Sequence, residues 1–212
     1  MLGILCGLES EAKIARKIPG AIVACAAARP GKARALAREL IGQGATKLMS
    51  FGIAGSLESS VHLGDVFIGT RVAAFNRQWQ CDEAWGRALA DKIPQAKRGG
   101  VYGSEILIGT VAEKNEIFVA TGCAIVDMES QCAAEIAADH KVPFLVVRAV
   151  CDDSGMNVPS LVMAAIAEDG SIDVMRALGH LALHPLQAVD LFHVMRGTNK
   201  ALAALKSITA LI

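Results

Sequence analysis

Short apolar runs alternate with segments of helical period along this chain. The runs that predict buried strands are residues 2–6, 21–26, 47–51, 65–73, 100–102, 105–108, 124–127 and 143–151. The segments that predict helices are residues 9–17, 29–41, 83–92, 111–118, 129–140, 161–167, 171–183 and 185–212, the last with a break near Gly197. Strands alternating with helices predict an α/β fold in three layers, with a central mixed, mostly parallel sheet flanked by helices.

Composition narrows the class of protein. Of the 212 residues, 53% are hydrophobic, which suffices for one domain over residues 1–212. Lys plus Arg and Asp plus Glu number 21 each, so no net charge attracts nucleic acid. Six cysteines without a CxxC pair favour a reducing compartment. No apolar run reaches the roughly 18 residues of a membrane span, so we expect a cytoplasmic protein without a transmembrane segment.

Two acidic clusters follow predicted strands, at the edge where α/β proteins hold ligands. Glu129 follows Asp127 and Met128 and opens a predicted helix. Its carboxylate could grip a vicinal diol such as that of ribose, with Met128 as an apolar wall. The alternative is that Glu129 is only an acidic residue at the start of the helix, which Asp127 caps. Asp152 ends an apolar strand, where desolvation and the neighbouring Asp153 would raise its pKa. A protonated Asp152 could donate to a leaving group. The alternative is that Asp152 is only a turn residue.

Further candidates lie in the first half of the chain. Glu11 could orient a water or a substrate hydroxyl, or it could simply fill the first turn of a helix. Gly7 and Gly52 follow strands and allow a ligand close to the backbone, although a tight turn explains Gly52 equally well. Arg29 stands at a helix start suited to phosphate, with a surface role as the alternative. The five histidines lack metal-ligand spacing, so we expect no metal.

Together these motifs resemble the superfamily of purine nucleoside phosphorylases, uridine phosphorylases and methylthioadenosine/S-adenosylhomocysteine nucleosidases. Val126-Asp127-Met128-Glu129-Ser130 and Val146-Val147-Arg148-Ala149-Val150-Cys151-Asp152 are similar to the nucleosidases' V-E-M-E-[AS] and V-R-A-I-S-D. The resemblance runs from Gly3 to about Asp153. It implies the phosphorylase/nucleosidase fold and cleavage of the N-glycosidic bond of a purine nucleoside.

The resemblance also implies a role for each acid. Glu129 would bind the ribose hydroxyls, with Asp127 and Met128 beside the sugar, and Asp152 would protonate or hydrogen-bond the purine N7. We expect Glu129 to stay ionised and Asp152 to be biased toward its protonated form. Glu11 matches the water-activating Glu of the nucleosidases.

The nucleophile stays open at this point. Phosphorylases carry Arg at the positions of Glu11 and Ser50 and Ser or Thr at Ile53, so those phosphate ligands are missing. Arg29, with Gly7 and Gly52, could rebuild a phosphate site. The resemblance therefore implies no cofactor, with inorganic phosphate as an alternative co-substrate to water.

The narrower resemblance is to the hopanoid-associated phosphorylase branch. Ile106 replaces the aromatic residue that packs on the purine, and the short segment 76–100 could leave room for a bulky 5′ group. Residues 169–174 and the basic, apolar C-terminal helices are also similar to that branch. It implies release of adenine from a lipid-linked nucleoside, adenosylhopane, by a homo-oligomer with peripheral membrane contact. The alternatives are a methylthioadenosine/S-adenosylhomocysteine nucleosidase and a non-catalytic nucleoside- or lipid-binding relative.

Overall fold

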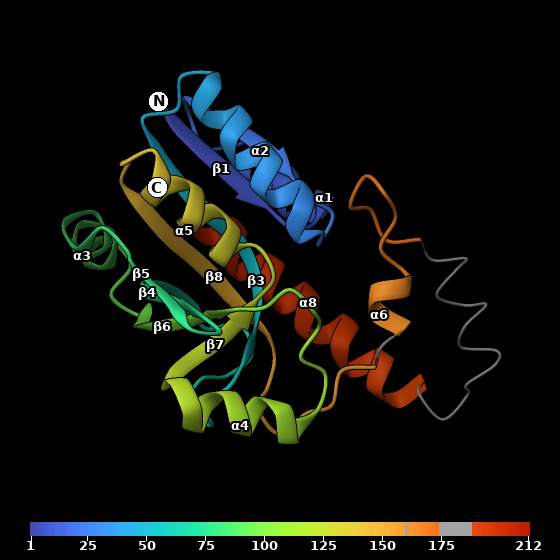
Figure 1. Ribbon diagram of the computed structural model, residues 1–212. Helices are drawn as coiled ribbons and strands as arrows, with labels where there is room; N and C mark the ends of the chain where they lie inside the picture. The colour runs from blue at the N-terminus through green and yellow to red at the C-terminus, as the bar shows by residue number, and fades with distance from the viewer. Residues whose placement is uncertain (160, 174–187) are drawn as a thin grey trace.

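The structure, a computed structural model, describes residues 1–159, 161–173 and 188–212 (Figure 1). The strands described are β1 (Leu2–Cys6), β2 (Ala21–Cys25), β3 (Lys47–Ser56), β4 (Val66–Ala74), β5 (Arg77–Gln80), β6 (Lys97–Gly103), β7 (Cys123–Asp127) and β8 (Phe144–Asp152). The helices described are α1 (Glu9–Ala15), α2 (Pro30–Gly42), α3 (Glu83–Lys92), α4 (Val111–Thr121), α5 (Ser130–Asp139), α6 (Leu161–Ala164) and α8 (Ala188–Ile208), which a 3-10 turn (Thr209–Leu211) follows.

The strands form one sheet that closes on itself. β3 pairs with β8, β8 with β4, β4 with β6 and β6 with β7, and β7 returns to β3. β1 and β2 extend the sheet beyond β3, and β5 pairs with β4. Five of these eight pairings are parallel, so the predicted mixed, mostly parallel sheet is confirmed.

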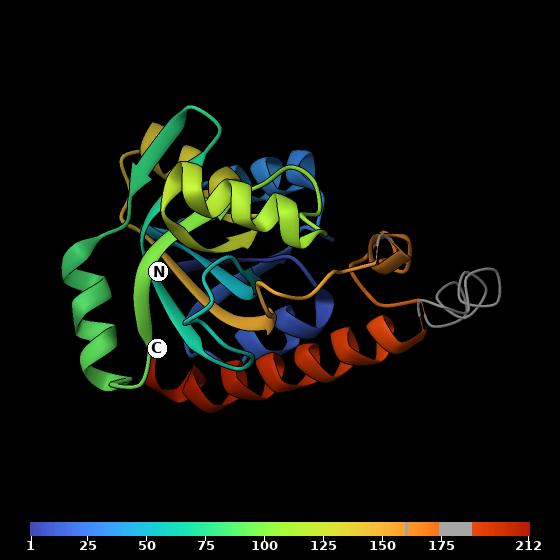
Figure 2. The same cartoon turned by 90° about the horizontal axis from the view of Figure 1, so that it is seen from below.

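Helices cover both faces of the sheet, which gives the predicted three layers (Figure 2). On one face α8 packs along β8 and β3 and contacts α1. On the other face α2 and α5 pack together, and α5 also contacts β3, β4 and β6. Within the residues described, no helix is long and apolar enough to cross a membrane.

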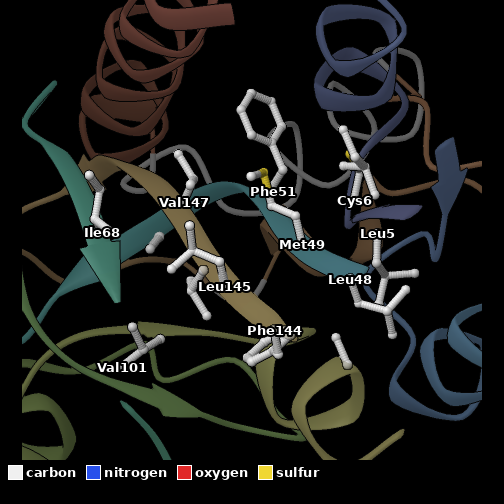
Figure 3. Packing of buried hydrophobic residues seen from close by; sticks show 14 of the residues in the cluster. Leu5, Cys6, Leu48, Met49, Phe51, Ile68, Val101, Phe144, Leu145 and Val147 are labelled. Atoms are coloured by element: carbon white, nitrogen blue, oxygen red, sulfur yellow. The ribbon is translucent and has the colours of Figure 1, made fainter. Parts of the chain in front are cut away.

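The core fills the space between these layers. Its members line β3 and β8 in particular, as Figure 3 shows for Met49, Phe51, Leu145 and Val147, all fully buried. Burying side chains of this size stabilises the fold by about 1.5–3 kcal/mol each. The core therefore holds β3 and β8 rigidly, and these two strands carry much of the site.

One edge of β3 is divided between two partners. β1 pairs with Leu48 and its neighbours up to Ser50, whereas β7 pairs with Gly55 and Ser56. None of the strands that the structure describes pairs with residues 51–54 at this edge. Their backbone groups need other partners, because an unpaired buried amide is costly. The split in the edge of β3 is where the acidic side chains gather.

The helix α4 has well-defined ends. Thr110 and Glu113 form a capping box, in which the Thr110 hydroxyl accepts from the Glu113 amide at 3.2 Å and the Glu113 carboxylate accepts from the Thr110 amide at 2.8 Å. Gly122 ends the helix in the left-handed conformation, with φ of 62°. These caps fix the register of α4 against the sheet, and so the position of Lys114.

Five predictions about the elements need correction. Residues 105–108 form no strand, because the loop after β6 turns at Ser104, whose hydroxyl donates to the Ile106 carbonyl at 2.7 Å. Strand β3 continues through Gly52, where a turn was an option, and the short polar strand β5 was not predicted. Helix α6 is shorter than residues 161–167, because it ends at Ala164.

The fifth correction concerns the C-terminal helix. Helix α8 does not break at Gly197, whose missing side chain lets the helix approach the backbone carbonyl of Cys151. Of the helix predicted at residues 171–183, residues 174–183 lie outside the described residues, as do residues 185–187 of the next one.

Candidate active site

Glu11 reaches from α1 into the split in the edge of β3. Its side chain is buried, and one carboxylate oxygen accepts from the Ile53 amide at 2.8 Å. The other oxygen accepts from the amides of Gly7 and Leu8, both at 2.8 Å. Glu11 therefore satisfies backbone donors just after β1 and within β3 and joins these two strands, which is more than filling the first turn of a helix.

Arg148 lies at the centre of the acidic group. It is fully buried in β8, and its Nε lies 2.7 Å from Asp127 Oδ2, while Nη2 lies 3.3 Å from Glu129 Oε2. Nη2 also donates to the Ser50 hydroxyl at 2.6 Å. This single guanidinium, which projects from the middle of β8, contacts the end of β7 and the interior of β3.

Asp127 serves the structure with both of its oxygens. Oδ1 accepts from the amides of Glu129 and Ser130, at 3.2 and 2.9 Å, so Asp127 caps the start of α5. Oδ2 pairs with Arg148 and accepts from the Ser130 hydroxyl. Glu129 lacks such a capping bond, and its carboxylate points back to Arg148. The capping alternative therefore fits Asp127 and not Glu129.

Three buried carboxylates share this one cation. Burial raises the pKa of Glu129 to about 8, against the attraction of Arg148, and Asp127 and Glu11 raise it further. Burial likewise raises the pKa of Glu11, opposed by Arg148 and by the backbone amides that it accepts from. Burial and the neighbouring carboxylates therefore oppose the expected ionisation of Glu129, whereas Arg148 favours it.

Two glycines make room for this cluster. A Cβ added to Gly7 would lie 2.6 Å from Glu129 Oε1, and one added to Gly52 would lie 2.6 Å from Glu11 Oε1. Real Cβ atoms do not approach oxygen so closely, so both positions require glycine. Both glycines adjoin carboxylates, and Gly52 also adjoins the Arg148 guanidinium, whereas a phosphate site was expected at both.

Asp152 lies at the other end of the site, where β8 ends. Its carboxylate packs on Gly55, where an added Cβ would lie 2.9 Å from Oδ1. Lys114 from α4, itself buried, forms an ion pair with Asp152 Oδ1. The expected bias of Asp152 toward its protonated form stays a prediction.

A small hollow of about 50 Å³ lies beside Asp152. Its other lining residues include Met128, Asp127 and residues 106–108. Ile106 stands at its rim with 65% of its surface exposed. The structure therefore brings Met128, Ile106 and Asp152 together around one hollow, while Glu11 and Glu129 meet at Arg148.

Arg29 lies apart from this group. Its half-exposed guanidinium is 3.9 Å from the Glu168 carboxylate. Among the described residues, no ion pair or hydrogen bond joins the Arg29 side chain to Glu11 or Glu129. The structure thus places the carboxylates of Glu129 and Glu11 beside Gly7 and Gly52, whereas Arg29 lies next to the acidic side chain of Glu168.

Two important residues were missed from the sequence. Arg148 sits inside an otherwise apolar strand, and a charged residue in such a run must have a buried partner. Lys114 shares a helix face with Ile117, Phe118 and Thr121, at spacings of three, four and seven residues. A charge on an apolar strand or helix face was the signal that could have found both.

Solved structures of similar fold include, by name, a nucleosidase and a hydrolase. The 5′-methylthioadenosine/S-adenosyl homocysteine nucleosidase of Helicobacter pylori has a TM-score of 0.72 and 14% identity, covering 100% of this chain and 98% of that one. The futalosine hydrolase of the same organism has a TM-score of 0.71 and 14% identity, covering 100% and 97%. At these identities the likeness shows the fold.

Sequence comparison gives the family. A 5′-methylthioadenosine/S-adenosylhomocysteine nucleosidase of Staphylococcus aureus (strain JH9) is 31% identical over 127 residues, which cover 50% of this chain and 56% of the relative. The chain thus spans about half the length of the curated relatives it matches. A family model described as the phosphorylase superfamily matches residues 15–178. The chain belongs to the phosphorylase superfamily.

Proposed function

We propose that this protein hydrolyses the N-glycosidic bond of an adenine nucleoside. The observation that carries this proposal is the pair Glu11 and Glu129, two buried carboxylates that meet at Arg148 where the edge of β3 is split. Asp152 stands beyond Gly55 on the side of the hollow. A nucleoside needs groups for its nucleophile, its sugar and its base, and the site offers an acid for each.

Each acid has a task that its surroundings support. Glu129, with its raised pKa, can both donate to and accept from the ribose hydroxyls. Met128 beside it provides an apolar wall for the sugar. Asp152 donates a proton to the base, which takes the electron pair of the glycosidic bond as it leaves. Glu11 accepts the proton of the attacking water.

Water is the better nucleophile for this site than phosphate. Glu11, Asp127 and Glu129 surround Arg148, and that guanidinium is engaged by Asp127 and Ser50. A phosphate dianion would be repelled by such a group of carboxylates. Arg29, the cation that could offset this repulsion, is next to Glu168. The names of the similar proteins, nucleosidase and hydrolase, also favour water.

For the substrate we propose an adenine nucleoside with a bulky apolar 5′ group, of which adenosylhopane is the example. Ile106 leaves the rim of the hollow without an aromatic cover, and it is itself largely exposed. A second candidate is methylthioadenosine or S-adenosylhomocysteine, which the curated relatives' names favour. A homo-oligomer, contact with a membrane surface and a cytoplasmic location stay predictions.

The test is adenine release from nucleosides with short and long 5′ groups, each with and without inorganic phosphate. The proposal expects release that needs no phosphate and a higher kcat/KM for the long apolar group. A preference for methylthioadenosine would favour the second candidate. Tight nucleoside binding without any base release would overturn the enzymatic proposal and indicate a binding protein.

A further inference from the structure

Lys114 is the one buried residue of α4, a helix that the structure describes completely. Its side chain is 1% exposed. Lysine is almost never buried to this extent without a partner, because its ammonium loses hydration. Its neighbours on the helix, Asn115 and Glu116, are exposed. The position of Lys114 therefore has to be explained by what its ammonium contacts.

The ammonium has three N–H groups and three acceptors. It pairs with Asp152 Oδ1, and it donates to the carbonyls of Asp153 at 2.9 Å and Met156 at 3.0 Å. All its donors are thus engaged. Lys114 has none left for a substrate, and any effect on the reaction must pass through Asp152.

Lys114 fixes how the Asp152 carboxylate is presented. Oδ1 is held by the ammonium, and the carboxylate lies on the bare backbone of Gly55. Oδ2 accepts only from the neutral thiol of Cys151 among the described residues, at 3.2 Å. Oδ2 is therefore the oxygen more easily given to a ligand in the hollow that Asp152 lines.

The same helix joins the two walls of the hollow. The Val111 amide donates to Asn157 Oδ1 at 3.0 Å, and the Val158 amide donates to the Gly109 carbonyl at 2.7 Å. With the bond from Lys114 to Met156, these contacts tie the segment before α4 to the segment after β8. The segment before α4 carries Ile106. Lys114 thus couples the rim of the hollow to Asp152.

Charge gives a second reason for the pair. When the glycosidic bond breaks, its electrons go to the base, which gains negative charge. A lone carboxylate beside that base would oppose the charge, whereas an ammonium behind the carboxylate offsets it. In the cluster around Arg148, by contrast, one guanidinium is shared by several carboxylates.

We propose that Lys114 is a positioning residue for base release: it acts through Asp152, by holding the carboxylate toward the base and neutralising its charge. The proposal rests on the proposed function, because it presupposes cleavage of a nucleoside at this site. It adds a residue on α4 to the acids already described.

A double-mutant cycle of Lys114→Met and Asp152→Asn tests this role. Each single variant should lower kcat for adenine release on the order of 10²-fold. If Lys114 acts through Asp152, the double variant should be about as slow as Asp152→Asn alone. If the fold-losses in kcat of the two single variants multiply in the double variant, the proposal is overturned, because independent effects add in free energy. Glu116→Gln on the same helix is the matched control and should keep wild-type kcat.

Two further readouts keep the result unambiguous. If Lys114→Met does not fold, the double variant, which removes both charges of the pair, still allows comparison with Asp152→Asn, and equal rates support the proposal. Wild-type protein that releases no base would overturn the proposed function, and the role of Lys114 with it. An active wild type with multiplicative losses would overturn the role of Lys114 only.

Discussion

The two ends of the site balance their charges differently. At the inner end, Glu11, Asp127 and Glu129 surround the single guanidinium of Arg148, and all are buried. At the outer end, Asp152 has an ammonium of its own. The inner end therefore has an excess of acid and raises the pKa of Glu129 to about 8, whereas the outer end is compensated.

This difference shows how one residue type acquires different tasks. A carboxylate with a raised pKa can exchange protons and hydrogen bonds with water and sugar hydroxyls near neutral pH. A carboxyl group paired with a buried ammonium has a fixed orientation, and the ammonium offsets any negative charge on it. The inner end is thus suited to the nucleophile and the ribose, and the outer end to fixing the base.

The largest effect is expected from Arg148→Met. It would leave three buried carboxylates without their cation, so the free energy of unfolding should fall by roughly 3–5 kcal/mol. Urea denaturation measures this change. Arg98→Met, which breaks the more exposed pair with Glu83, is the control and should cost about 1 kcal/mol or less. A similarly small cost for Arg148→Met would mean that the inner cluster does not depend on its guanidinium.

Glu11→Gln tests the inner end for chemistry. Removing the base for the attacking water should lower kcat on the order of 10³-fold while substrate binding persists. Steady-state kinetics of adenine release gives both quantities. Glu9→Gln removes a carboxylate from the same turn, where it pairs with Arg16 near the surface, and should keep wild-type kcat. Near-wild-type turnover of Glu11→Gln would return Glu11 to a structural role.

The raised pKa of Glu129 predicts a pH dependence of stability. Its carboxyl titrates near 4.5 when unfolded and at about 8 when folded, so the native state holds an extra proton between these values. This contribution to stability is complete below pH 4.5 and is lost as the pH rises through about 8.

Thermal unfolding of wild type and Glu129→Gln measures this contribution. A range of roughly pH 5 to pH 9 covers the loss of the extra proton from the folded protein. As the pH rises, the Tm of wild type should fall relative to the Tm of Glu129→Gln. Glu113→Gln, an exposed acid of α4, serves as control. A constant difference over the range would mean that Glu129 is already ionised in the folded protein.

The smallest effect concerns the rim of the hollow. Ile106→Phe would supply an aromatic face for the purine, a gain of about 0.5–1.5 kcal/mol, so KM for methylthioadenosine should fall roughly two- to tenfold. Val119→Phe adds a ring at an exposed position of α4 and is the control. An unchanged KM for Ile106→Phe would place the base elsewhere.

Much of this arrangement could be predicted from the sequence, because strand ends mark the functional edge. The positions of Glu11, Glu129 and Asp152 followed from their apolar neighbours. Their protonation could not be predicted, since it depends on how many carboxylates share a cation. Arg148 and Lys114 were missed because their partners come from distant parts of the chain. The polar strand β5 was missed because it lacks an apolar alternation.

Identification of the sugar product by mass spectrometry tests the central claim most directly. An adenine nucleoside with a 5′ substituent would be incubated with the protein in the presence of inorganic phosphate. The carboxylate-rich inner end predicts a free reducing sugar alongside adenine, in the same amount with or without phosphate. A ribose 1-phosphate product would contradict the assignment of water as the nucleophile and of Glu11 as its base.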